Sequence, residues 1–213
     1  MSDLTIYLGN KNYASWSLRA WLALKHTAAE FDEVVIPLYE PGSRQTVMQY
    51  SPSGRVPALR HGDLTVWDSF AICEYLAELF PDAGLWPSDP QARAAARAVS
   101  AEMHAGFAAM RQEMPMNIRS SFPGRPLTSE AQADINRIMS IWRDCRSRFG
   151  DGNGDFLFGP FTIADAMYAP VVLRFNHYGA TGLTASSQAY VQQWLQNALM
   201  REWIADAVKE TSG

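Results

Sequence analysis

The sequence predicts a small mixed α/β domain followed by an all-helical domain. Residues 1–80 alternate short apolar runs with helical patterns in the order β-α-β-α-β-β-α, whereas residues 91–213 hold helical patterns only. The segment between them, residues 81–90, contains three prolines and one glycine and has the composition of a linker. We therefore expect one domain over 1–80, a linker over 81–90 and a helical domain over 91–213.

The α/β part opens with a strand-helix-strand unit. An apolar strand over residues 4–8 precedes a helical pattern over 15–26, and residues 31–37 form a second strand rich in valine and isoleucine. A crossover helix between two strands predicts a parallel pair. Residues 41–50 then form a short, weak helix or an irregular segment.

A hairpin and a helix start complete this domain. Residues 56–59 and 64–67 are extended runs around the turn at residues 61–63, which predicts an antiparallel hairpin. Asp68 and Ser69 stand where the next helix must begin.

Both features suit ligand binding. A cis bond before Pro57 would leave the Val56 backbone free to pair with an extended peptide. Asp68 and Ser69 offer a carboxylate, a hydroxyl and unpaired helix amides, which together can bind an α-amino acid head group. The alternative is an ordinary hairpin followed by an ordinary N-cap.

The helical part contains several predicted helices. The patterns place an alanine-rich helix over 91–113, ended or kinked at Pro115, a long helix over 129–149 ended at 150–153, and a final helical pattern over 191–207.

One further helix has a recognisable start. Thr162 and Asp165 have the spacing of a capping box ahead of an apolar helix that Pro170 could kink. We interpret this box as structural.

Composition excludes several functions. The net charge of −4 over 213 residues argues against a dedicated surface for nucleic acid or anionic membranes. Two cysteines are too few for a disulfide framework, and no His/Cys spacing suggests a metal site. The N-terminus lacks a signal-peptide pattern, and no run approaches the ~18 apolar residues of a membrane span. We expect a cytoplasmic protein that binds no metal, nucleic acid or membrane.

Two motifs carry a resemblance to a known family. SGRVPAL at 53–59 followed by DSFAICEYL at 68–76 resembles the glutathione-binding half of the glutathione S-transferase superfamily, and the resemblance covers nearly the whole chain. It implies a thioredoxin-like first domain, a homodimer, and glutathione as substrate or cosubstrate. It further implies that glutathione is bound by Arg55, Val56, Pro57, Asp68 and Ser69.

The reactive group of this family lies between the first strand and the first helix, where it stabilises the glutathione thiolate. A free thiol has a pKa near ~8.5, so a hydroxyl donor at a helix N-terminus favours the anion at neutral pH. The segment around Ser15 resembles the zeta class, whose loop reads Ser-Ser-Cys-Ser-Trp, but Asn12 stands where that class has its catalytic serine. Ser15 is our first choice of donor, with Asn12 and Tyr7 as alternatives, and Ser15 could instead be only an N-cap.

The second substrate would lie over the sulfur against the alanine-rich helix. Met103, Phe107 and Met110, with Met114 and Met116, could form a soft apolar wall there. The alternative for such a methionine stripe is plain core.

The leading hypothesis is a bacterial-type glutathione transferase of detoxification, related to the zeta and tau-like classes. It would conjugate the thiolate to a hydrophobic electrophile, or reduce a peroxide or disulfide. One alternative is a non-catalytic glutathione-binding or regulatory protein of the same fold. Another is a glutathione-dependent isomerase, against which the loss of the Ser-Ser-Cys signature counts.

Overall fold

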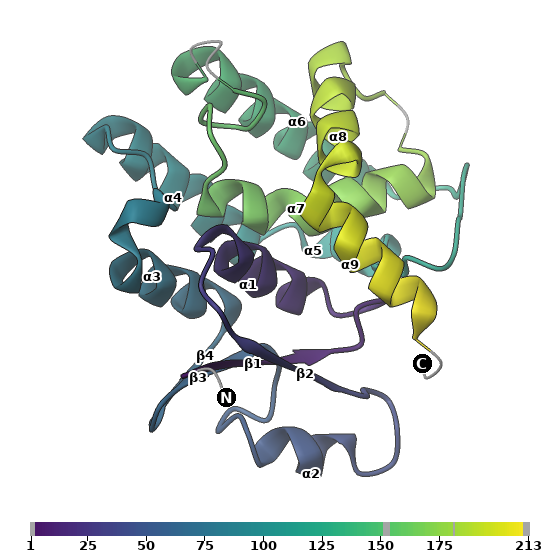
Figure 1. The fold of residues 1–213 in the computed structure, drawn as a ribbon. Helices are drawn as coiled ribbons and strands as arrows, with labels where there is room; N and C mark the ends of the chain where they lie inside the picture. The colour runs from purple at the N-terminus through teal and green to yellow at the C-terminus, as the bar shows by residue number, and fades with distance from the viewer. Residues whose placement is uncertain (1–2, 151–153, 181, 211–213) are drawn as a thin grey trace.

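The computed structural model describes residues 3–150, 154–180 and 182–210 (Figure 1). Its sheet contains β1 (Leu4–Gly9), β2 (Asp32–Ile36), β3 (Ala58–His61) and β4 (Leu64–Trp67) in the order β2-β1-β3-β4. β1 and β2 are parallel, whereas β1 with β3 and β3 with β4 are antiparallel. The predicted mixed sheet is therefore confirmed.

Three helices cover this sheet. α1 (Ser15–His26) and α3 (Ser69–Leu79) lie between the sheet and the helical part, and α2 (Ser43–Met48) lies on the opposite face (Figure 1). The order β-α-β-α-β-β-α agrees with the sequence prediction and gives the thioredoxin-like arrangement. It places the start of α1 and the start of α3 on the side that faces the helical part.

The rest of the described chain is helical. After a single 3-10 turn at Pro81–Ala83, its helices are α4 (Pro90–Ala105), α5 (Ala108–Glu113), α6 (Ser129–Phe149), α7 (Ile163–Tyr178), α8 (Ala185–Gln196) and α9 (Ala198–Lys209). Within the described ranges, no helix combines the length and apolar character needed to cross a bilayer.

Two predicted helices are each divided in the structure. The helix expected over 91–113 breaks where Gly106 takes an extended conformation and Phe107 a left-handed one at φ 59°. The pattern at 191–207 divides at Asn197, whose side chain caps α9 by accepting from the backbone N–H groups of Leu199 and Met200. Part of the predicted break at 150–153 lies outside the described residues.

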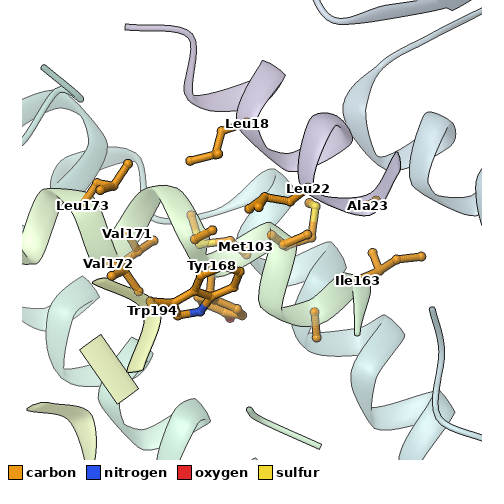
Figure 2. Packing of buried hydrophobic residues seen from close by; sticks show 14 of the residues in the cluster. Leu18, Leu22, Ala23, Met103, Ile163, Tyr168, Val171, Val172, Leu173 and Trp194 are labelled. Atoms are coloured by element: carbon orange, nitrogen blue, oxygen red, sulfur yellow. The ribbon is translucent and has the colours of Figure 1, made fainter. Parts of the chain in front are cut away.

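The two parts share a hydrophobic core in which α1 packs on α7 (Figure 2). The capping box is confirmed at the start of α7. The Asp165 carboxylate accepts from the backbone N–H and the hydroxyl of Thr162, each at 2.9 Å, and from Leu157 and Tyr190. Pro170 lies inside a continuous α7.

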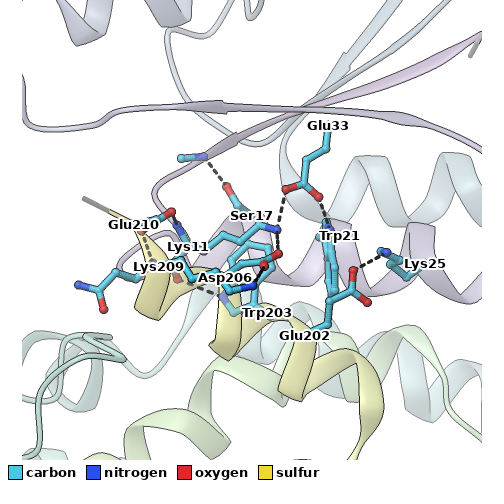
Figure 3. Close-up of polar contacts among 12 residues, drawn as sticks. Lys11, Ser17, Trp21, Lys25, Glu33, Glu202, Trp203, Asp206, Lys209 and Glu210 are labelled. Carbon is cyan, nitrogen blue, oxygen red and sulfur yellow. Dashed lines mark hydrogen bonds and ion pairs between the residues drawn. The ribbon is translucent and has the colours of Figure 1, made fainter. Parts of the chain in front are cut away.

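A polar cluster fastens α9 to the loop before α1 (Figure 3). The buried Lys11 Nζ lies 2.6 Å from Glu33 and 2.8 Å from Asp206. The Glu210 carboxylate accepts from the backbone N–H groups of Lys11 and Asn12, at 2.5 and 3.1 Å. The C-terminal helix thus fixes the loop that carries the candidate catalytic residues.

Candidate active site

The residues predicted to bind glutathione line one cavity of about 520 Å³, here called the Ser69 cavity. It lies where the start of α1, the segment before β3, the start of α3 and the end of α4 meet. Its lining consists of Trp16, Ser53, Arg55, Val56, Pro57, Trp67, Asp68, Ser69 and His104. A larger cavity of about 630 Å³ beside the linker holds none of the predicted site residues.

The Val56–Pro57 peptide bond is cis, as predicted from the sequence. Val56 and Pro57 precede β3, which begins at Ala58, so they lie outside the strand ladder and beside the cavity.

Asp68 and Ser69 have different roles at the start of α3. Asp68 is the N-cap of α3, and its Oδ1 accepts from the backbone N–H groups of Phe70 and Ala71. It does so at φ 72°, a left-handed conformation that costs a non-glycine residue free energy and often marks functional sites. Ser69 is the first residue of α3, and its buried Oγ has no hydrogen-bond partner among the described residues. A buried hydroxyl without a partner at a cavity wall is suited to a polar ligand.

His104 joins this site from the end of α4. Its Nε2 lies 3.2 Å from Asp68 Oδ2. Burial lowers the pKa of His104, the positive charges of Arg19 and Arg111 lower it further, and Asp68 opposes the shift. The imidazole is therefore mainly neutral at neutral pH, and its contact with Asp68 is a hydrogen bond, not an ion pair. Nothing in the sequence around His104 could have revealed this contact.

Ser15 is held by a buried arginine and does not act as a cap. Ala14 is the N-cap residue of α1, and Ser15 is the first helical residue. The Ser15 Oγ accepts a hydrogen bond from Arg174 Nη2 on α7, at 3.3 Å. The alternative in which Ser15 is merely the N-cap is therefore wrong.

The other two candidate donors, Asn12 and Tyr7, are engaged in other contacts, and none of the three lines the Ser69 cavity. Asn12 is fully buried, and its Oδ1 accepts from the backbone N–H of Arg119 at 2.9 Å. Tyr7 is buried on β1 and stacks on Tyr50 with ring centroids 4.4 Å apart. Ser15 does not line this cavity either, but it directly precedes the lining residue Trp16 in the first turn of α1.

The methionine wall requires a correction. Met103 and Met110 are fully buried, Phe107 is nearly so, and the three belong to the hydrophobic core. None of the three lines the Ser69 cavity or the neighbouring cavity described next, so the structure does not bring them to the site. A neighbouring cavity of about 430 Å³, here called the Arg174 cavity, is instead lined by Tyr13, Tyr39, Arg111, Pro115, Met116 and Arg174.

Comparison with known proteins decides the family. Residues 13–79 match the family model described as glutathione S-transferase, N-terminal domain, and residues 90–205 match the glutathione S-transferase C-terminal domain. The chain belongs to the glutathione S-transferase family. The two matching domains and the related enzymes identify the chain as a glutathione-dependent enzyme.

Individual relatives agree with this assignment. A probable maleylacetoacetate isomerase of Caenorhabditis elegans is 34% identical over 172 residues, which cover 79% of this chain and 77% of the relative. Glutathione S-transferase F13 of Arabidopsis thaliana is 25% identical over 201 residues, 86% of this chain and 85% of the relative.

Solved structures show the same fold. A glutathione transferase homolog from Burkholderia, determined with bound glutathione, has a TM-score of 0.71 at 23% identity, covering 97% of this chain and 98% of that chain. Glutathione transferase Omega 2S from Trametes versicolor has a TM-score of 0.72 at 21% identity, covering 97% of this chain and 96% of that chain.

Proposed function

We propose that this glutathione S-transferase binds glutathione in the Ser69 cavity and joins the glutathione sulfur to an electrophilic carbon of a second substrate. The observation that carries the proposal is the buried, unpartnered Oγ of Ser69 in a cavity that gathers Arg55, Val56, Pro57 and Asp68. No other described cavity holds this set.

Each end of the tripeptide has a matching group. The Ser69 hydroxyl donates to the γ-glutamyl carboxylate, and Asp68 Oδ2 accepts from the γ-glutamyl ammonium. Arg55, which is exposed at the cavity rim, pairs with the glycine carboxylate through its forked donors. The cysteine moiety lies between these ends, against the Val56 backbone, with its sulfur directed towards the start of α1.

The chemical step needs an ionised thiol. Ser15 donates a hydrogen bond to the sulfur, and the N-terminus of α1 adds positive potential, so the thiolate is favoured at neutral pH. The sulfur then forms a bond to the electrophilic carbon, and the leaving group departs with its bonding electron pair. Where the electrophile is an unsaturated carbonyl compound, the carbon next to the carbonyl takes a proton instead.

Two buried serines provide a matched test of the binding site. Ser69→Ala removes the proposed donor, whereas Ser100→Ala removes an equally unpartnered buried hydroxyl on α4 that does not line the cavity. In a calorimetric titration with glutathione, Ser69→Ala should bind about tenfold or more weakly, the effect of losing a hydrogen bond to a charged group. Ser100→Ala should bind as the wild type does. Equal affinity in all three proteins would move the site elsewhere.

A second candidate function is glutathione-dependent isomerisation, which the 34% identical relative from C. elegans favours by its name. In that reaction the sulfur adds to a conjugated double bond and is eliminated after bond rotation, so glutathione is regenerated. Measuring free thiol during turnover separates the two reactions. A transferase consumes one glutathione for each product, whereas an isomerase leaves the glutathione concentration unchanged.

We also retain the homodimer that the resemblance implied. β4 is an edge strand of the sheet, and it exposes 48% of Leu64 and 45% of Trp67 to solvent. Exposed apolar side chains on a sheet edge favour association with a second surface. Sedimentation at micromolar concentration should give the mass of a dimer, and a monomeric mass would contradict the prediction.

A further inference from the structure

Three arginines from separate elements converge beside Ser15 without a matching set of carboxylates. Arg19 on α1 is 1% exposed, Arg174 on α7 is 5% exposed, and Arg111 on α5 is half-buried. Four buried guanidinium nitrogens have no hydrogen-bond partner among the described residues, namely Nε and Nη1 of Arg19, Nη1 of Arg111 and Nη1 of Arg174. Buried charged donors that lack partners are costly, so a site that keeps them needs a reason.

Their charges repel one another within the protein. Burial lowers the pKa of Arg19 to about 9, and the charges of Arg174 and Arg111 contribute to this shift. Burial lowers the pKa of Arg174 to about 10, and Arg111 again contributes. Both groups are still cations at neutral pH. Asp134 is the carboxylate that acts on Arg111, and it also accepts from the backbone N–H of Met110.

The cluster opens to a cavity that lies next to the glutathione site. Arg111 and Arg174 line the Arg174 cavity, and Trp16 of the Ser69 cavity lies across Arg19 and Arg111, at 4.3 and 5.2 Å from ring centroid to guanidinium carbon. Arg174 also binds Ser15. A group held in the Arg174 cavity is therefore next to the residue that we propose for the sulfur.

The other walls of the Arg174 cavity are aromatic and apolar. Tyr13 and Tyr39 meet edge to face, with centroids 5.9 Å apart, and Tyr39 is largely exposed. Pro115 and Met116 complete the lining. An aromatic ring of a ligand packs favourably against the rings of tyrosines and against the polarisable sulfur of methionine. The forked guanidinium donors of arginine suit the two oxygens of a carboxylate.

We propose that the Arg174 cavity binds an aromatic carboxylic acid, with its carboxylate on Arg111 and Arg174 and its ring between Tyr13, Tyr39 and Met116. Resting on the proposed function, this assignment makes the aromatic acid the second substrate of the enzyme. It replaces the uncharged, methionine-lined site that the sequence predicted.

A matched pair of electrophiles tests the proposal. Chloronitrobenzoate and its uncharged amide, chloronitrobenzamide, share the ring and the reacting carbon. In each, the thiolate sulfur forms a bond to the ring carbon, and chloride leaves with the bonding pair. Arg111→Met should lower kcat/KM for the acid about tenfold or more and that for the amide less than about threefold, as expected for one lost guanidinium–carboxylate pair. Arg174→Met also removes the hydrogen bond to Ser15, so it should lower kcat/KM for both electrophiles, with the larger loss for the acid. Arg137→Met is the control, because Arg137 is exposed, pairs with Glu102 and lines neither the Arg174 cavity nor the Ser69 cavity.

Because Arg111 is only half-buried, Arg111→Met should fold and can be assayed even if Arg174→Met does not fold. Equal losses for acid and amide, or no loss in either, would overturn the anion site while leaving the transferase function intact.

A binding measurement separates this proposal from the proposed function. Benzoate should raise the melting temperature of the wild type but not of Arg111→Met, and benzamide should raise neither. If the wild type turns over neither electrophile, the transferase function is contradicted. Stabilisation of the wild type by benzoate would still support the anion site in that case. No stabilisation by benzoate would overturn the site, and equal stabilisation by succinate would overturn its preference for an aromatic acid.

Discussion

The Arg174 guanidinium donates a hydrogen bond from Nη2 to the Oγ of Ser15 over 3.3 Å, and so links α7 to the first turn of α1. This contact occupies an oxygen lone pair of Ser15 and leaves its hydroxyl proton free to be donated elsewhere. Arg174 is itself fixed, because its Nε donates to the Met114 carbonyl at 2.8 Å. The pair therefore presents a donor and a positive charge to the side on which we place the glutathione sulfur.

The polar cluster around Lys11 should contribute strongly to the free energy of unfolding. Lys11→Met leaves Glu33 and Asp206 without their shared buried cation, and we expect a loss of about 3 kcal/mol in the free energy of unfolding. Lys25→Met, which breaks the exposed pair with Glu202, should cost no more than about 1 kcal/mol. Urea denaturation of both variants measures the contrast. Similar small losses in the two would show that α9 is not held through Lys11.

Asp165 should make the free energy of unfolding depend on pH. Burial raises the pKa of Asp165 to about 6, although hydrogen bonds from Leu157, Thr162 and Tyr190 act in the opposite direction. Because this folded-state pKa lies above the ordinary value of 3.8, the contribution to stability is complete below about pH 4 and is lost as the pH rises through about 6. The stability of the wild type relative to Asp165→Asn should therefore fall by about 1–3 kcal/mol between about pH 4 and about pH 7.

Urea denaturation of the wild type and Asp165→Asn at each pH measures this difference. Groups that titrate in both proteins cancel in the subtraction. A difference that stays constant or grows with pH would contradict the raised pKa.

Local patterns were sufficient for much of the fold. The bounds of α1 and α6 agree with the spacing of their apolar residues, and the hairpin and capping box have local signatures. The break at Phe107 was missed because a left-handed non-glycine residue has no reliable signature, although Gly106 beside it was a signal.

The glutathione side of the site was also predictable, since its residues lie in two short adjacent motifs. The arginine cluster was not, because Arg19, Arg111 and Arg174 are far apart in sequence and meet only when α1, α5 and α7 pack together. One signal was available: Arg174 is a charged residue within the otherwise apolar stretch 169–175 of the α7 pattern. Such a position requires a buried partner or a ligand.

The most direct test of the account is the titration of enzyme-bound glutathione, followed by thiolate absorbance against pH, in the wild type, Ser15→Ala and Asn12→Ala. We predict that the thiol of the wild-type complex ionises well below its free pKa of ~8.5, that Ser15→Ala raises the pKa by about one unit or more, and that Asn12→Ala leaves it unchanged. A pKa that is unmoved by Ser15→Ala but raised by Asn12→Ala would contradict the account and restore Asn12 as the thiolate donor.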